Sequence, residues 1–199
     1  MKAMKNVCLF GASCPDMDRT YFEDARLLGS LLARRGFGLV FGGGNTGLMG
    51  AAARGFGEAG GHITGVIPEK LNVPGIAYPG CDELIVTPDM HTRKAKMEEL
   101  SCAYIAMPGG YGTLEELLEV LTLNQLGYIS APVVLLNTLN YFGPLVKQLD
   151  DCIEKQFTAQ ACRGIYSVAA DAAEAVQAVS EFVMPELPNK IKDALKRNA

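Results

Sequence analysis

The sequence predicts one α/β domain in which a mostly parallel sheet carries helices on both faces. Short apolar runs alternate along the chain with longer amphipathic segments, as in proteins built from successive strand–helix units. The chain has 199 residues and is 49% apolar, which suits one sizeable hydrophobic core. No linker or change of composition marks a boundary, so we expect a single domain over residues 1–199.

Seven apolar runs are the expected strands, and each is bounded by glycine, proline or polar residues. They cover residues 6–11, 38–42, 62–67, 83–87, 103–107, 132–137 and 164–169. Most of them are almost continuously apolar rather than alternating. This pattern is typical of strands that are covered on both faces.

The segments between these runs are the expected helices. The first covers residues 17–35, where leucines recur at helical spacing and Gly36 ends the pattern. The others cover residues 47–58, 90–102, 113–126, 141–156 and 171–183. Residues 68–82 are rich in proline and glycine and are expected to form a loop at the rim of a site. The chain ends in a basic tail at about residues 186–199.

The overall charge excludes several classes of partner. A formal net charge of -4 and a pI of about 5.2 give no general attraction to nucleic acid or to an anionic membrane.

The six cysteines form no C-x-x-C pair, and only two histidines accompany them. We therefore expect no metal site and a reduced, cytoplasmic protein. No apolar stretch approaches the roughly 20 residues that span a bilayer.

Two glycine-rich loops follow expected strands and are candidates for anion binding. They read GGGNTGLMG at residues 42–50, with Gly43 and Gly44 as candidate contacts, and PGGYGT at residues 108–113. Neither is a Walker A sequence or a clean G-x-G-x-x-G motif, which disfavours hydrolysis of nucleoside triphosphates and ordinary dinucleotide binding. Glycines before a helix still allow backbone N–H groups to hold one phosphate. The alternative for each loop is a tight turn that binds nothing.

A basic helix lies between the two loops. In MHTRKAKM, residues 90–97, Met90, Arg93, Lys94 and Met97 share one helix face. The planar guanidinium of Arg93 suits a phosphate or a carboxylate. In the alternative interpretation both cations extend to solvent and Lys94 pairs with Glu98.

The head of the helix after PGGYGT also has two interpretations. The sequence TLEE fits a capping box, with Thr113 as N-cap and Glu116 reaching back to it. Alternatively, Glu116 is a functional carboxylate. Glu115 points about 100° away from Glu116 on an ideal helix and is a poor second member of a catalytic pair.

The segments GGGNTGLMG, MHTRK and PGGYGTLEELLEVLTLNQLG, in this order, resemble the Lonely Guy (LOG) family of cytokinin riboside 5′-monophosphate phosphoribohydrolases. The resemblance covers about residues 7–166. It implies a Rossmann-like fold, a homodimer or larger assembly, no cofactor, and hydrolysis of the N-glycosidic bond of a nucleoside 5′-monophosphate. It also implies that Arg93 and Glu116 are catalytic. The implied substrate contacts are Met90, Lys94, Gly109, Gly110, Gly112, Thr113 and Thr122.

Two positions depart from the family pattern. The family commonly has a glutamate where Gly75 stands, eighteen residues before Arg93, and a tryptophan where Leu123 stands. These departures bear on which base is accepted. A general nucleoside 5′-monophosphate nucleosidase therefore remains open, as does a carrier of a phosphorylated ligand such as molybdenum cofactor.

The expected chemistry explains why a glycine loop and a carboxylate stand together. The 5′-phosphate is an anion for the loop, whereas the ribose develops positive charge as the bond to the base breaks. We expect Glu116 to stabilise that charge and to orient or deprotonate water. Arg93 is expected to neutralise the phosphate or the departing base and to hold Glu116 ionised.

Overall fold

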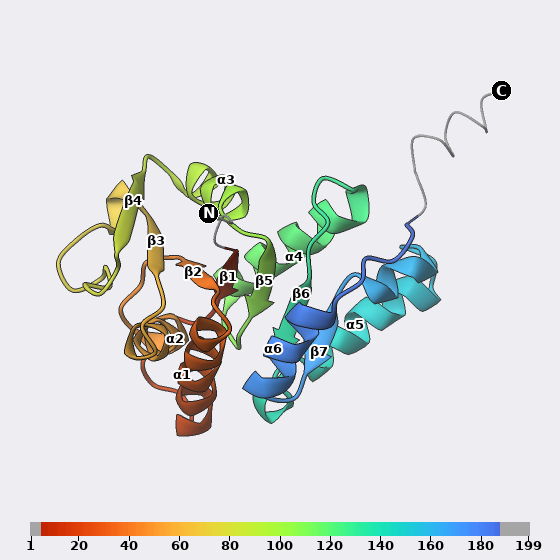
Figure 1. Cartoon of the computed structure of the whole chain (residues 1–199). Helices are drawn as coiled ribbons and strands as arrows, with labels where there is room; N and C mark the ends of the chain where they lie inside the picture. The colour runs from red at the N-terminus through yellow and green to blue at the C-terminus, as the bar shows by residue number, and fades with distance from the viewer. Residues whose placement is uncertain (1–4, 188–199) are drawn as a thin grey trace.

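The computed structural model describes residues 5–187 and contains one seven-stranded sheet (Figure 1). Its strands lie in the order β4-β3-β2-β1-β5-β6-β7, and each neighbouring pair is parallel. The strands are β1 Asn6–Phe10, β2 Gly38–Phe41, β3 Ile63–Pro68, β4 Glu83–Thr87, β5 Ala103–Ala106, β6 Val133–Leu136 and β7 Ser167–Ala169. The predicted α/β fold is confirmed, and the sheet is parallel throughout rather than mostly so.

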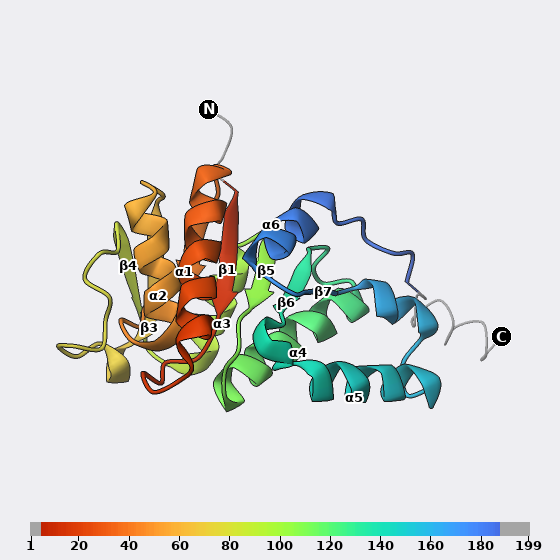
Figure 2. The same cartoon turned by 90° about the horizontal axis from the view of Figure 1, so that it is seen from below.

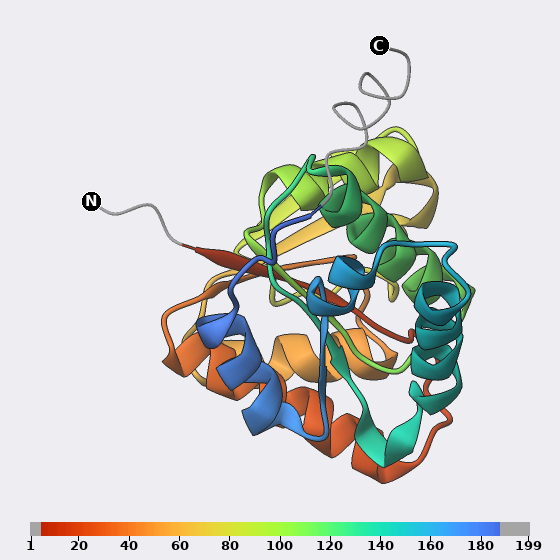
Figure 3. The same cartoon turned by 90° about the vertical axis from the view of Figure 1, so that its right-hand side faces the viewer.

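Six α-helices within residues 5–187 cover the two faces of this sheet. They are α1 Arg19–Arg34, α2 Gly47–Glu58, α3 Met90–Glu99, α4 Tyr111–Leu126, α5 Gly143–Glu154 and α6 Ala172–Glu181. Viewed along the sheet, α1, α2 and α6 lie on one side and α3, α4 and α5 on the other (Figure 3). Helix α1 packs directly beside α2, as Figure 2 also shows.

The side chains of the central strands divide between two cores. In β1, Val7 and Leu9 pack in the core under α1, α2 and α6, whereas Cys8 and Phe10 pack in the core on the opposite face. Successive side chains of a strand point to opposite faces, so a strand between two helical layers must be apolar at every position. This is why the expected strands read as continuous apolar runs.

Several boundaries differ from the expectation. Helix α4 begins at Tyr111 rather than at residue 113, and α3 ends at Glu99 rather than at residue 102. Strand β7 begins at Ser167 rather than at residue 164, and a 3-10 helix, Gln160–Gly164, precedes it. The loop at residues 68–82 is confirmed in outline, although its first residue, Pro68, still belongs to β3. The predicted tail lies almost wholly outside the described residues.

The order of the strands determines where a ligand can bind. From β1 the chain winds outward through β2, β3 and β4, then returns to place β5 on the other side of β1. Ligands in open parallel sheets bind beyond the carboxyl ends of the strands at such a point of reversal. The loops that follow β1 and β5 meet there, where the Ala12 N–H donates to the Pro108 carbonyl at 3.0 Å.

Two further classes of feature are absent from this part of the chain. Over residues 5–187, none of the helices combines the length and apolar character needed to cross a membrane. The same residues contain no group of three or more His, Cys, Asp or Glu side chains arranged to hold a metal ion.

Candidate active site

A cavity of about 660 Å³ opens at the carboxyl ends of the central strands. Its walls come from the loops after β1, β2 and β3, from α3, and from the start of α4. The residues that line it are Gly11, Ala12, Ser13, Gly42, Gly44, Thr46, Met49, Ile67, Leu71, Gly75, Ile76, Met90, Arg93, Gly110, Tyr111, Gly112, Thr113, Glu115 and Glu116. Pockets for small ligands and cofactors commonly span roughly 300–1,000 Å³, so a nucleotide-sized ligand fits this volume.

The second glycine loop leaves a row of backbone N–H groups free at this cavity. Its carbonyls are tied to the protein, since Pro108 accepts from Ala12 and Gly110 accepts from the Leu114 N–H at 3.1 Å. Within the described residues, the N–H groups of residues 110–113 donate to no other group. They also lie at the positive end of the α4 dipole. The loop can therefore cradle a phosphate, as its sequence predicted.

The three glycines of the second loop, Gly109, Gly110 and Gly112, are needed for two different reasons. A Cβ on Gly109 would lie 2.1 Å from the Thr113 hydroxyl oxygen, so packing against the protein already excludes a side chain there. A Cβ on Gly110 or Gly112 would meet no protein atom within 4 Å. Both of these glycines line the cavity, and their missing side chains leave its backbone open to close approach by a ligand.

The helix end of the first glycine loop is occupied by the protein itself, and the expectation that this loop also holds a phosphate stays a prediction. The N–H of Leu48, in the first turn of α2, donates to the Ala12 carbonyl at 2.8 Å instead of facing a ligand. Gly43 lies outside the cavity lining, and its carbonyl accepts from the Tyr78 N–H at 2.8 Å. Gly44 does line the cavity. The loop therefore anchors the segment at residues 76–78, which closes one side of the site.

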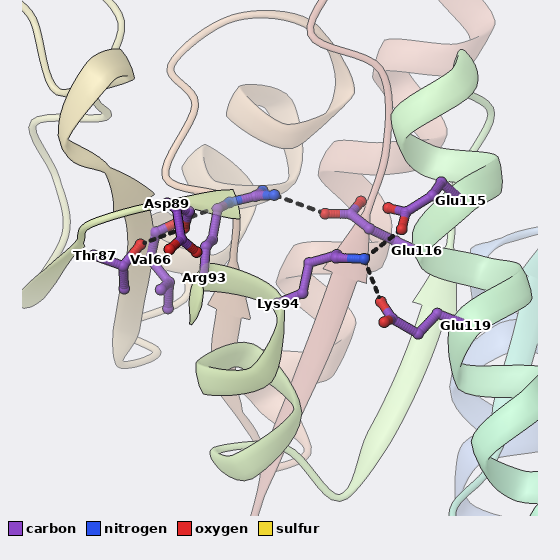
Figure 4. Close-up of polar contacts among 8 residues, drawn as sticks. All are labelled: Val66, Thr87, Asp89, Arg93, Lys94, Glu115, Glu116 and Glu119. Atoms are coloured by element: carbon purple, nitrogen blue, oxygen red, sulfur yellow. Dashed lines mark hydrogen bonds and ion pairs between the residues drawn. The ribbon is translucent and has the colours of Figure 1, made fainter. Parts of the chain in front are cut away.

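Arg93 passes through the floor of the cavity and is only 7% exposed. Its Nε donates to the Val66 carbonyl at 3.1 Å, and its Nη1 donates to Oε1 of Glu116 at 2.9 Å (Figure 4). A Cβ at position 42 would lie 1.9 Å from its Nη2, so Gly42 is the residue that lets the guanidinium pass. The alternative in which Arg93 extends to solvent is wrong.

Glu116 is a buried carboxylate rather than a helix cap. Because α4 begins at Tyr111, after Gly110, Glu116 lies in the second turn and Thr113 lies inside the helix. The capping-box interpretation is therefore wrong. The Glu116 side chain is 11% exposed and pairs with Arg93. Burial raises its pKa, and the neighbouring guanidinium of Arg93 offsets only part of that rise.

Lys94 belongs to a second ion pair, outside the cavity. Its ammonium contacts the carboxylates of Glu115 and Glu119, the latter at 2.8 Å (Figure 4). The expected pairing with Glu98 is therefore replaced by these two contacts. Burial alone would lower the pKa of Lys94, but hydrogen bonds to these two carboxylates reverse the effect and raise it. Lys94 does not line the cavity, so the structure does not place it as a substrate contact. Glu115 reaches the rim of the cavity but is half exposed and engaged by Lys94.

Of the remaining predicted residues, some line the cavity and one lies outside it. Met90 and Thr113 line the cavity, and so does Gly75, whose φ of +87° suits glycine. Thr122 lies outside it, in a groove between α4 and α5, and its hydroxyl donates to the Leu118 carbonyl at 2.7 Å. Within the described chain Thr122 is therefore separated from Arg93 and Glu116.

One part of the cavity was not predicted from the sequence, and a second was predicted only as a loop at the rim of a site, over residues 68–82. The first is the loop after β1, Gly11 to Ser13, which lies between the two glycine loops. The position of β1 at the reversal of strand order could have identified it, but only once the order was known. The second is an apolar wall formed by Ile67, Leu71 and other side chains. No local sequence pattern distinguishes this wall from ordinary core or loop residues.

Together, the fold and the cavity define a class: a Rossmann-like protein with a row of free backbone N–H groups beside a buried Arg–Glu pair. Comparison with known proteins specifies it further. The model of a family described as "possible lysine decarboxylase" matches residues 49–179. A probable cytokinin riboside 5′-monophosphate phosphoribohydrolase, LOGL3 of Oryza sativa subsp. japonica, is 42% identical over 179 residues, which are 90% of this chain and 85% of that protein. The LOG1 enzyme of Arabidopsis thaliana is 41% identical over 90% of this chain and 84% of its own length. The chain belongs to this LOG family.

Solved structures give a second group of similar proteins. The Moco carrier protein of Chlamydomonas reinhardtii matches with a TM-score of 0.69 and 28% identity, over 90% of this chain and 97% of that one. A molybdenum cofactor binding protein from Rippkaea orientalis matches with a TM-score of 0.65 over 90% of this chain and 98% of its own. At 21% identity, the second match shows a shared fold alone.

Proposed function

We propose that this protein hydrolyses the N-glycosidic bond of a nucleoside 5′-monophosphate, releasing the free base and ribose 5-phosphate. One observation carries the proposal: the buried Arg93–Glu116 pair faces the same cavity as the free N–H groups of residues 110–113. Such a cavity offers an anion site and a carboxylate together, and the substrate needs both. The names of the similar plant enzymes agree with this activity.

The phosphate end of the substrate is held by backbone. We assign the 5′-phosphate to the N–H groups that precede and begin α4, where the helix dipole adds to the attraction. The open space at Gly110 and Gly112 lets phosphate oxygens approach the backbone closely. Binding there fixes the ribose relative to Glu116, which stands one helical turn further along α4.

Glu116 acts on the ribose and on water. As the bond from C1′ to the base breaks, the bonding electrons leave with the base and positive charge grows on the ribose, where the carboxylate stabilises it. Water then adds through its oxygen to C1′, Glu116 accepts the proton that the water loses, and this proton passes to the departed base, which restores the carboxylate. Burial raises the pKa of Glu116 and so makes it a stronger base than an ordinary carboxylate, while the guanidinium of Arg93 favours its ionised form.

The substrate class follows from the apolar wall of the cavity and from the relatives. Ile67, Leu71 and Ile76 line one side, with Met49 and Met90 beside them. These side chains suit a base with an apolar substituent, so we favour N6-modified adenosine 5′-monophosphate, as in cytokinin activation, over unmodified nucleotides. Gly75 lies at the rim and removes a side chain from this wall. A broader nucleosidase is the alternative.

Decarboxylation of lysine is disfavoured by the residues of the site. No lysine lines the cavity among the described residues. Lys94, which is nearby, has a raised pKa because two carboxylates hold its ammonium. A lysine that forms a Schiff base must lose its proton readily, which requires the opposite shift. The site therefore does not fit the reaction that the family description names.

Assembly and location form part of the same proposal. Helix α4 exposes apolar side chains on its outer side, including Leu118 at 42% and Leu126 at 49%, and Phe157 beside the adjoining groove is 81% exposed. We propose that a second copy of the chain covers this face in a homodimer. Light scattering at micromolar concentration tests it, and a monomer would contradict it. A cytoplasmic location fits an intracellular nucleotide substrate.

The test of the activity is a substrate panel. Purified protein is incubated with AMP, with other nucleoside monophosphates and with isopentenyladenosine monophosphate, and free base is quantified by chromatography. We expect base release, fastest from the isopentenyl nucleotide. Equal rates across the panel would replace the cytokinin assignment with a general nucleosidase.

A second candidate function is that of a carrier, which binds a phosphorylated ligand without converting it. The likeness to the Moco carrier protein favours it. It predicts a phosphorylated ligand that co-purifies with the unaltered protein and no base release from any nucleotide. We rank it lower because the sequence is closer to the phosphoribohydrolases, at 42% against 28% identity. Turnover of any member of the panel would exclude a purely carrying role.

A further inference from the structure

Tyr141, which lies between β6 and α5, contacts the phosphate loop without lining the cavity. Its hydroxyl donates a hydrogen bond to the carbonyl oxygen of Gly109, across 32 residues of sequence. Tyr141 is 39% exposed and takes no part in the site as described so far. Within the described residues, this hydroxyl is the partner of the Gly109 carbonyl.

The direction of one peptide group depends on this contact. The C=O and N–H of a trans peptide point in opposite directions, and residues 5–187 contain no cis peptide. When Tyr141 holds the Gly109 carbonyl on its own side, the N–H of Gly110 points to the other side. Gly110 lines the cavity there, and its N–H is one of the free donors.

This peptide group needs an external anchor because it lies between two glycines. Without a Cβ on either side, rotation of the peptide plane meets little steric resistance. The preceding carbonyl, of Pro108, is anchored by Ala12, and the following one, of Gly110, by Leu114. The Gly109 carbonyl is the one of the three whose partner is a side chain, so a single substitution can release it.

Tyr141 is itself held firmly in place. Its ring packs edge-on against Tyr21 and Phe142, with centroid distances of 6.3 and 5.1 Å. The preceding turn keeps Leu139 and Asn140 at positive φ values of 52° and 57°, which non-glycine residues adopt only at a cost in energy. The Asn137 side chain accepts from the Phe142 N–H at 2.7 Å and braces this turn.

We propose that Tyr141 is a positioning residue that fixes the Gly109–Gly110 peptide, so that the Gly110 N–H faces the 5′-phosphate of the substrate. The inference rests on the proposed function in one respect, the assignment of the phosphate to this loop. It adds a residue from outside the cavity to the determinants of phosphate recognition. Removing the hydroxyl lets the peptide rotate, which turns a carbonyl oxygen toward an anion and withdraws a donor.

The experiment compares Tyr141→Phe with Tyr21→Phe, since each removes one hydroxyl from the same aromatic cluster. Calorimetry measures binding of ribose 5-phosphate, which contains no glycosidic bond to a base, and of adenosine, which carries no phosphate. In Tyr141→Phe we expect ribose 5-phosphate to bind about tenfold more weakly, the loss of one charge-assisted hydrogen bond, with adenosine unaffected. Tyr21→Phe should match the wild type for both ligands.

Kinetics and stability separate positioning from general damage. With a nucleoside monophosphate, Tyr141→Phe should raise KM about tenfold and leave kcat within about twofold, because the phosphate contact is equal in the ground and transition states. Unchanged binding of ribose 5-phosphate, an equal loss for adenosine, or no binding by the wild type would each overturn the inference. Failure of the proposed function gives a different result: no base release, with phosphate-selective binding and its dependence on Tyr141 intact.

Discussion

Two sets of ion pairs join α3 to α4 through neighbouring residues, yet only the Arg93–Glu116 pair has both members in the lining of the cavity. Arg93 pairs with Glu116 at 2.9 Å, and both side chains are about one-tenth exposed. Lys94 pairs with Glu115 and Glu119, whose side chains are 55% and 36% exposed. The two cations are adjacent in sequence, as are Glu115 and Glu116. A step of about 100° around a helix places Arg93 and Glu116 in the floor of the cavity, whereas Lys94 and Glu119 lie outside it and Glu115 reaches only its rim.

The difference shows that position, rather than residue type, assigns these charges their roles. A buried carboxylate has a raised pKa and a guanidinium at hydrogen-bond distance, which equips it for chemistry. A half-exposed carboxylate beside an ammonium is a surface ion pair that fastens two helices and contributes little to stability. The following predictions test this contrast, from the largest expected effect to the smallest.

Replacing Glu116 by Gln should give the largest effect. We expect kcat to fall at least about 10³-fold, because the amide neither stabilises the ribosyl cation nor accepts a proton from water. Glu115→Gln is the matched control and should stay within about threefold of the wild type. Both are measured as base released per enzyme, after calorimetry has shown that nucleotide still binds. Similar losses of kcat in the two variants would show that Glu116 and Glu115 do not differ in function.

Replacing Arg93 by Met should lower activity and stability together. We expect kcat/KM to fall about 10²-fold, since a cation next to the reacting groups is lost. The melting temperature should drop by roughly 10 °C, because Glu116 and the Val66 carbonyl lose a buried partner. Steady-state kinetics and thermal unfolding measure the two effects. A variant that is less stable but has an unchanged kcat/KM would show that Arg93 serves packing alone.

The pH dependence of activity should reflect the burial of Glu116. Its pKa lies above the ordinary glutamate value of 4.5, and the ionised form is the active one. The rate should therefore fall as pH decreases through the raised pKa, with an acid limb above pH 4.5. A kcat/KM profile measured with a nucleotide substrate checks this, and the protein's melting temperature is followed over the same range. An acid limb at or below 4.5 would assign the titration to an exposed carboxyl group.

Replacing Lys94 by Met should give the smallest effect. The ion pairs of Lys94 contribute less than about 1 kcal/mol, since their carboxylates are partly solvated. Turnover should remain within about threefold of the wild type. Because the Lys94 charge lowers the pKa of Glu116, its removal should move the acid limb slightly upward in pH. A loss of activity comparable with that of Arg93→Met would indicate that Lys94 contacts the substrate after all.

Much of the fold could be predicted because the determining signals are local. The central strands lie between two helical layers, so they had to be continuously apolar, and seven such runs became the seven strands. The second glycine loop was also predictable, because its glycines directly precede a helix. Element ends were less accurate, as at β7, where a 3-10 helix replaces the expected beginning of the strand.

The errors at the site came from contacts between distant segments. The TLEE sequence fits a capping box, but α4 begins two residues before Thr113 and Arg93 engages Glu116 from another helix. The first glycine loop resembles the second in composition, yet the Ala12 carbonyl occupies its helix terminus. Neither contact is encoded in the local pattern. Both depend on the order of the strands, which brings α3 beside α4 and the loop after β1 against the start of α2.

The central claim is tested most directly by identifying the products from one nucleotide. Isopentenyladenosine monophosphate is incubated with the wild-type protein, and isopentenyladenine and ribose 5-phosphate are quantified in the same samples. We predict that the two appear in equal amounts, at a rate that Glu116→Gln nearly abolishes. A protein that binds the nucleotide and returns it intact, or that releases inorganic phosphate and the nucleoside instead, would contradict the account.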